Sequence, residues 1–190
     1  MPVDLLNPEE CNALLKLARQ ALELSVRGEP LPDLSLDELP RKFRQPGASF
    51  VTLTIASKLR GCIGTLEPFR PLAEDVRRHA VAAAFKDYRF PNVTENELEQ
   101  ISIEVSYLSE PKPLEYQRAE DLLKQLRPGV DGVVLRAGSR RATFLPQVWE
   151  KIPDPVAFMN ELSLKMDAPA DSWRTGDLTV ETYQVQEFHE

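Results

Sequence analysis

The chain has 190 residues and a mass of 21.5 kDa, which is enough to bury a hydrophobic core without disulfides or metal ions. Its formal net charge of −7 disfavours a broad phosphate-binding face, so we expect no nucleic-acid partner. The sequence has neither a run of about 20 apolar residues nor the marks of a secretory signal, so we expect a cytoplasmic protein that does not enter a membrane.

The first predicted helix begins at Asn7, whose side chain can cap it, with Pro8 at the first helical position and Glu10 completing a capping box. Cys11 heads an apolar stripe at helical spacing, and we interpret it as a small core residue. Four prolines between residues 28 and 47 forbid a continuous helix, so this segment is predicted to be an extended surface loop.

The middle of the first half is predicted to be a hairpin followed by a helix. Phe50–Ile55 alternates as a strand does, and a turn at residues 56–58 joins it to Leu59–Ile63. The helix from about Leu72 to Lys86 is apolar all round in its last part, which predicts burial on more than one side. The next strand is predicted at Ile101–Tyr107.

The second half repeats this order of elements. A short helix is predicted at Ala119–Leu126, then a hairpin of Gly132–Arg136 and Arg141–Leu145, then a helix from Pro155 to about Met166. The last segment, Leu178–Phe188, is predicted to be one strand, although its alternation is imperfect.

Phe50–Lys86 and Val133–Met166 thus each form a predicted hairpin, a Pro-containing connection and a helix. We interpret this as a structural duplication. Few residues are identical between the copies, so independent similarity is the alternative. The predicted fold is an α+β domain spanning residues 1–190, an antiparallel sheet with flanking helices, arranged in two intimately packed lobes that do not fold independently.

The most unusual segment is Leu59–Thr65, which places Gly61 and Gly64 in a short strand. Glycine weakens a strand, and the cost is usually offset by a bulge, a close backbone crossing, or a ligand against the bare amides. In a regular strand Arg60 and Cys62 would share a face, and the guanidinium would favour the thiolate. The alternative is a buried thiol and tight sheet packing.

Candidate partners for Cys62 are few. His79 is a weak candidate base for a Cys62–His79 dyad, and its alternative role is that of a hydrogen-bonded core residue. Asp87 and Arg89 follow the helix and form either a local salt bridge or part of a pocket. Glu104 faces solvent or lines the same cavity. The candidate ligand-binding residues are Arg60, Gly61, Gly64, Thr65, Asp87, Arg89 and Glu104.

Motifs for zinc, dinucleotides and phosphate loops do not occur in recognisable form, so no metal or cofactor is implied by motif. The sequence does resemble one known family. The hexapeptide Leu59–Gly64 is similar to the signature of the AMMECR domain family, whose prokaryotic members are called protein A of the AmmeMemoRadiSam system. Further similar segments are Phe50–Leu53, Ala82–Phe85, Asp87 with Arg89-Phe90, Ile103–Ser106, Pro128-Gly129 with Asp131-Gly132, and Phe144–Trp149.

The resemblance covers nearly the whole chain and implies a two-lobed α+β fold built on antiparallel sheet. It also implies association with a Memo-like protein and a radical-SAM protein, as the system name indicates. Two departures from the family pattern are Tyr88, where Pro is frequent, and Leu164–Asp167, which replaces a Lys-Ala-Gly run.

Two functions follow as hypotheses. The first is an accessory binding module whose cleft around Leu59–Thr65 takes a small polar ligand or a partner peptide. The second is an enzyme that uses Cys62 as a nucleophile or redox thiol. We favour binding, because the set of catalytic residues is small.

Overall fold

The computed structural model describes residues 5–175 and 178–190. The chain divides into two compact units, and we describe each by itself. Unit 1 comprises the chain up to Leu108 together with Gln186–Glu190, and unit 2 comprises Ser109–Val185.

Unit 1 has two long helices and a sheet. Its helices are α1 (Pro8–Val26), α2 (Arg41–Arg44) and α3 (Leu72–Phe85), with short 3-10 helices at Leu36–Glu38 and Glu95–Gln100. Its strands are β1 (Pro46–Ile55), β2 (Lys58–Gly64), β3 (Arg70–Pro71), β4 (Ile101–Leu108) and β9 (Val185–His189). The sheet has the order β2-β1-β4-β9, and β3 pairs with the beginning of β1.

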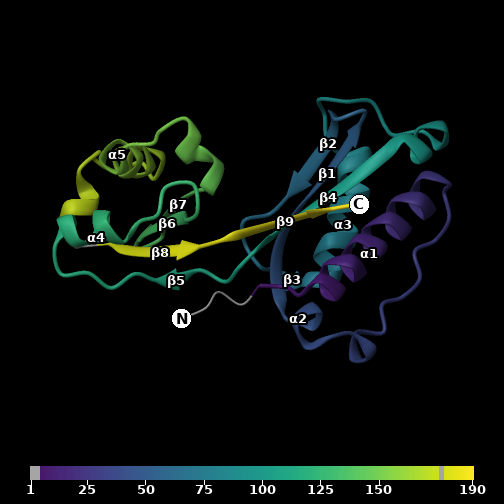
Figure 1. Ribbon diagram of the computed structural model, residues 1–190, viewed down its shortest axis with the longest axis horizontal. Helices are drawn as coiled ribbons and strands as arrows, with labels where there is room; N and C mark the ends of the chain where they lie inside the picture. Colours follow the sequence, from purple (N-terminus) through teal and green to yellow (C-terminus); the bar gives the residue numbers. More distant parts are fainter. Residues whose placement is uncertain (1–4, 176–177) are drawn as a thin grey trace. The chain divides into compact units, whose positions relative to one another are not determined.

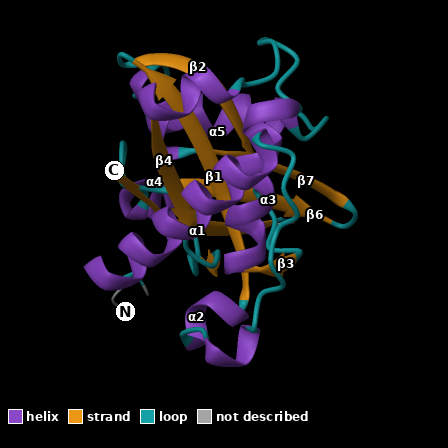
Figure 2. Cartoon of the chain, turned by 90° about the vertical axis from the view of Figure 1, so that its right-hand side faces the viewer, coloured by secondary structure: helices purple, strands orange, loops and turns teal. Residues whose placement is uncertain are grey.

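The two long helices of unit 1 lie together on one side of its sheet (Figures 1 and 2). Val51 and Leu53 of β1 and Ile103 and Val105 of β4 point to this side and are fully buried. Because side chains alternate along a strand, the residues between them point to the opposite side. We call this opposite side the open face, since most of its side chains are half-buried or exposed. Its buried residues are Ser106 and, at one end, Ala48 and its ladder partner Leu108.

The start of α1 confirms the predicted capping box. The side chain of Asn7 accepts a hydrogen bond from the Glu10 amide, and the Asn7 amide donates to the Glu10 carboxylate. These two bonds satisfy donors that a helix otherwise leaves unpaired at its beginning. Cys11 is buried in the core of unit 1, as its place on the apolar stripe predicts.

Unit 2 is a smaller α+β unit. Its helices are α4 (Ala119–Gln125) and α5 (Pro155–Lys165), with 3-10 helices at Pro146–Glu150 and Ser172–Arg174. Its strands are β5 (Lys112–Pro113), β6 (Gly132–Ala137), β7 (Arg140–Phe144) and β8 (Thr179–Tyr183), in the order β5-β8-β6-β7. Trp149 stacks on Phe158 in its core, with ring centroids 3.6 Å apart.

Both predicted hairpins are confirmed, and both sheets use them in the same way. The first strand of each hairpin lies between its hairpin partner and a later strand, giving β2-β1-β4 in unit 1 and β7-β6-β8 in unit 2. A helix follows each hairpin along the chain. The repeated order of elements seen in the sequence therefore corresponds to a repeated order of neighbouring strands.

The prediction of one strand at Leu178–Phe188 is wrong. This segment forms β8 and β9, which belong to the sheets of different units. The break falls at Gln184, whose amide donates to Ser109 Oγ instead of continuing a ladder. The imperfect alternation of the segment is explained by this change of sheet. Across the described ranges, every helix is too short or too polar to cross a membrane.

Candidate functional site

The strand that carries the hexapeptide is not regular. In the β1–β2 ladder, Gly61 lies opposite Leu53 while Leu59 lies opposite Thr54, so Arg60 is an extra residue without a partner. This is a β-bulge, which interrupts the alternation of side chains. The regular geometry that would place Arg60 and Cys62 on one face is therefore wrong.

Arg60 anchors the segment that follows α3. Its guanidinium donates to the Glu97 carboxylate at 2.7 and 3.2 Å and to the carbonyl oxygens of Pro91 and Asn92 at 2.8 and 3.2 Å. The Arg60 side chain is only 12% exposed. Hydrogen bonding by Arg60 outweighs the effect of burial and lowers the pKa of Glu97 to about 2. The contacts of Arg60 are those of a loop anchor.

The two glycines of the hexapeptide are required by close packing. A Cβ on Gly61 would overlap the main-chain carbonyl oxygen of Ala83 in α3. A Cβ on Gly64 would overlap the aromatic ring of Phe50, its partner across the ladder, and the carbonyl oxygen of Ser49. Of the three explanations considered for glycine here, the structure shows the bulge and the close backbone crossing.

Cys62 lies on the open face of the sheet. Its thiol accepts a hydrogen bond from Thr52 Oγ1 at 3.2 Å, and Thr52 alternates with the buried Val51 and Leu53. The thiol is half-buried, in contrast to the buried Cys11. Thr52 is opposite Cys62 on one side and Glu104 on the other, so these three residues form a row across β2, β1 and β4.

Asp87 connects the end of α3 to Cys62. Its carboxylate is 5% exposed and accepts a hydrogen bond from the Cys62 amide at 2.9 Å. Arg89 donates to the same carboxylate through Nε at 2.9 Å and Nη2 at 2.7 Å. Hydrogen bonding by Arg89 outweighs burial and holds the pKa of Asp87 well below its usual range. The local salt bridge, one of the two predicted alternatives, is thus formed, and Arg89 is the cation next to Cys62.

His79 does not contact Cys62. Its Nδ1 lies 3.2 Å from Asp75 Oδ2 and 3.3 Å from Ser49 Oγ, on the side of the sheet that the helices cover. Cys62 points to the other side, so the proposed Cys62–His79 dyad is wrong. His79 is a hydrogen-bonded core residue, which was the alternative prediction.

The residues around His79 were not found by sequence reasoning. Asp75 is fully buried and accepts hydrogen bonds from Ser49 Oγ at 2.7 Å and from Arg70 at 2.9 Å. Ser49, His79 and Asp75 have the composition of a hydrolytic triad but not its geometry, because Ser49 and Asp75 approach the same nitrogen of the imidazole. The cluster ties β1, β3 and α3 together.

Glu104 lies on the open face beside the end of β9. Burial and the neighbouring charge of Glu187 raise the pKa of Glu104, and His189 opposes them. Phe188 packs on the core, so the alternation of β9 places Glu187 on the open face. Thr52 and Glu187 were missed by sequence reasoning, because only the register of β1, β4 and β9 brings them next to Cys62 and Glu104.

Thr65 forms a local turn. Its hydroxyl accepts from the Glu67 amide at 3.2 Å, and its own amide donates to Ser49 O of β1 at 3.0 Å, across the hairpin. Within residues 5–175 and 178–190, no cluster of three or more His, Cys, Asp or Glu side chains could hold a metal ion.

The architecture defines an α+β protein with two antiparallel-sheet units and a bulged, glycine-containing edge strand. The chain belongs to the AMMECR1 family, whose model matches residues 15–188. A protein from Methanothermobacter thermautotrophicus is 39% identical over 190 residues, covering 97% of this chain and 96% of its own length. A protein from Thermofilum pendens is 37% identical, covering 97% and 92%.

The fold is shared with a solved structure. The crystal structure of an uncharacterised protein from Pyrococcus horikoshii is similar with a TM-score of 0.74 and 30% sequence identity. The match covers 97% of this chain and 93% of that one. The antiparallel sheets with flanking helices that the sequence predicts are therefore confirmed.

Proposed function

We propose that unit 1 is a binding module that takes a small polar ligand carrying an amine on its open face, along the row Cys62–Thr52–Glu104. The observation that carries this proposal is the row itself. A thiol, a hydroxyl and a carboxylate line up across three strands, on the side of the sheet away from α1 and α3. The hydroxyl and the thiol pair with each other, whereas the pKa of the half-buried Glu104 carboxylate is raised by burial and by Glu187. A half-buried carboxylate costs free energy, so a ligand that donates to Glu104 is stabilised.

The carboxylate of Glu104 indicates which class of ligand suits the row. Glu104 carries a raised pKa because burial and Glu187 disfavour its ionised form. A bound ammonium group would relieve both effects, since an opposite charge nearby favours the carboxylate. Phe50 is on the same face one row further along β1, and its ring lies over Gly64, which adds an apolar surface to this face. The ligand class that suits these groups is a small amine with an apolar portion.

The enzyme hypothesis has less support. A cysteine nucleophile needs a base within hydrogen-bond reach. His79 is on the other side of the sheet, and the group that contacts the thiol is the Thr52 hydroxyl, which is not a base at neutral pH. Association with Memo-like and radical-SAM proteins rests on family resemblance, and we retain it as a proposal.

Alkylation of Cys62 tests the binding proposal, and the chain contains its own control. With iodoacetamide, we expect Cys62 to react in the folded protein and Cys11 only after denaturation, because Cys11 is buried and burial raises the pKa of its thiol. Putrescine or ethanolamine should slow the alkylation of Cys62, whereas succinate and acetate should not. Mass spectrometry of small molecules that copurify with the chain provides a second readout.

The variant Glu104→Gln should abolish protection by the amines while leaving the fold intact. Glu99→Gln, which removes an exposed carboxylate from the 3-10 helix Glu95–Gln100, is the matched control and should retain protection. Equal protection by amines and carboxylates, or a Cys62 that reacts only after unfolding, would contradict the proposal.

A further inference from the structure

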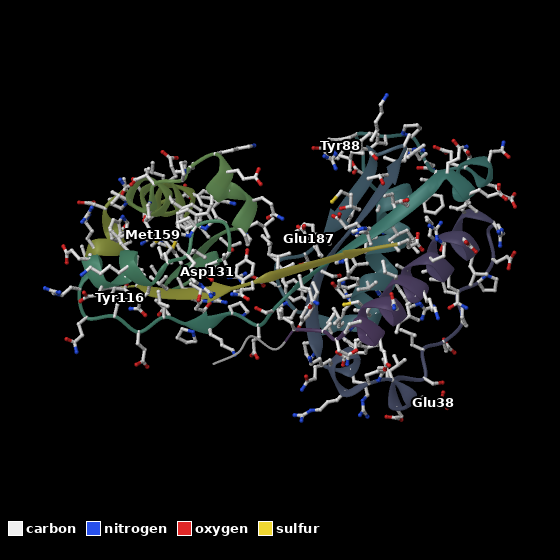
Figure 3. All side chains as sticks on the ribbon, viewed as in Figure 1. Glu38, Tyr88, Tyr116, Asp131, Met159 and Glu187 are labelled. Atoms are coloured by element: carbon white, nitrogen blue, oxygen red, sulfur yellow. The ribbon has the colours of Figure 1, made fainter. Side chains whose placement is uncertain are left out.

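A second surface of unit 1 has features that neither the fold nor the open face requires. The loop of residues 86–90 follows α3, and Tyr88 at its tip is 97% exposed (Figure 3). A large aromatic side chain left in water contributes little to the packing of its own chain. Its neighbours Lys86 and Arg89 are also exposed.

The loop backbone is nevertheless fixed on both sides of Tyr88. Before it, the Lys86 amide donates to Ala82 O at 2.7 Å, and the Asp87 carboxylate binds the Cys62 amide. After it, the Phe90 amide donates to Asp87 O at 3.1 Å.

The segment beyond the loop is fixed as well. The carbonyl oxygens of Pro91 and Asn92 accept from Arg60, and the Val93 amide donates to Ala84 O at 3.0 Å. Tyr88 is thus displayed on a backbone whose conformation is set before any partner arrives. A fixed loop loses little conformational entropy on binding, which favours affinity.

The charges beside Tyr88 indicate the kind of partner. Arg89 forms an ion pair with the buried Asp87, and its guanidinium carbon lies 5.5 Å from the centroid of the Phe90 ring. The N–H groups of Arg89 that do not bond Asp87 are therefore held in a fixed position. Lys86 adds an exposed positive charge, without an ion-pair partner among the described residues, to a chain whose net charge is −7. Tyrosine and arginine are the residue types that most often anchor protein interfaces.

We propose that the loop of residues 86–90 is a docking site for a protein partner. The partner supplies an apolar pocket for Tyr88 and carboxylates that pair with Lys86 and Arg89. The proposal is independent of the ligand on the open face, because the Tyr88 side chain points into solvent and is absent from the row Cys62–Thr52–Glu104. The partner is a protein, since the negative net charge of the chain disfavours a polyanion such as nucleic acid.

The test uses the full chain and a displayed library of random twelve-residue peptides. We expect selected peptides to combine aliphatic or aromatic residues with Asp or Glu. Tyr88→Ala should weaken their binding at least about tenfold, as expected for an interface anchor. Tyr88→Phe should retain most of the affinity, and Lys86→Glu should weaken it.

Phe69→Ala is the matched control, because Phe69 is another exposed aromatic residue of unit 1, and this variant should bind the peptides normally. Glu104→Gln should also bind them normally, which separates this proposal from the function proposed above. Selected peptides without acidic residues, or with equal affinity for Tyr88→Ala, would overturn the proposal. Tighter binding of a twelve-residue oligothymidylate at the same loop would overturn it in favour of nucleic acid.

Discussion

The carboxylate of Asp87 lies 2.9 Å from the main-chain nitrogen of Cys62, at the free edge of the unit 1 sheet. A side chain from the end of α3 thus takes the position that a carbonyl group of a further strand would occupy. Exposed edge strands tend to pair with other chains, and a charged side chain at the edge opposes this. The contact also joins the hexapeptide to the loop that displays Tyr88.

Replacing Asp87 by Ala should expose this edge. We expect the free energy of unfolding to fall by about 1–3 kcal/mol, because a buried, charge-assisted hydrogen bond is lost. The Cys62 amide should exchange with solvent deuterium faster than in the wild type, as measured by NMR. Asp37→Ala, at an exposed position of the 3-10 helix Leu36–Glu38, is the control and should change neither quantity. Unchanged exchange at Cys62 would show that Asp87 does not protect the edge.

The ion pair of Arg60 and Glu97 should make stability depend on pH. The pKa of Glu97 is lowered from 4.5 to about 2, so the pair contributes stability that is complete above pH 4.5 and lost as the pH falls toward 2. Arg60→Met should lower the free energy of unfolding by about 1.5–3 kcal/mol at pH 7. Urea unfolding at several pH values should show the difference from wild type shrinking below pH 4.5. A difference that stays constant down to pH 2 is incompatible with this assignment.

The two glycines of the hexapeptide should tolerate alanine less well than Gly138, where a Cβ would meet open space. Gly61→Ala should cost about 3 kcal/mol or more, because a methyl group would overlap a main-chain oxygen that cannot rotate away. Gly64→Ala should cost less in a Phe50→Ala background than in the wild type, whereas the cost of Gly61→Ala should be the same in both. Gly138→Ala has open space but a φ of +59°, and should cost only about 1–2 kcal/mol. Equal costs at all three glycines in thermal unfolding would refute the packing explanation.

Substitutions in the turn between β1 and β2 should increase the stability of the protein. Ala56 and Ser57 have φ values of +48° and +62°, a conformation that Asn and Gly adopt at less cost. The double change Ala56→Asn with Ser57→Gly should raise the free energy of unfolding by about 1 kcal/mol. Ala56→Val should have the opposite effect, because a branched side chain is strained at positive φ. The measurement is urea unfolding, and a loss of stability in the double variant would contradict the turn assignment.

Local patterns in the sequence predicted most of the elements correctly. The capping box of α1, the hairpin of β1 and β2 and the helix α3 each depend on residues close together in the chain, and each is confirmed. The segment Leu178–Phe188 was wrongly predicted to be one strand, because its division between two sheets depends on partner strands far away in the sequence. The dyad of Cys62 and His79 failed for a related reason, since sequence order brings hairpin and helix together but does not fix the face on which each side chain lies.

The sequence by itself determined the family, the α+β class and the importance of the segment Leu59–Thr65, because composition, periodicity and a specific hexapeptide are local properties. Only the tertiary structure decided what that segment does. A single bulged residue turns Arg60 toward Glu97, and the close approach of Ala83 and Phe50 accounts for both glycines. The register of three strands places Thr52 and Glu104 in line with Cys62. Such contacts join residues far apart in the chain, and their geometry is set by packing, which no local pattern encodes.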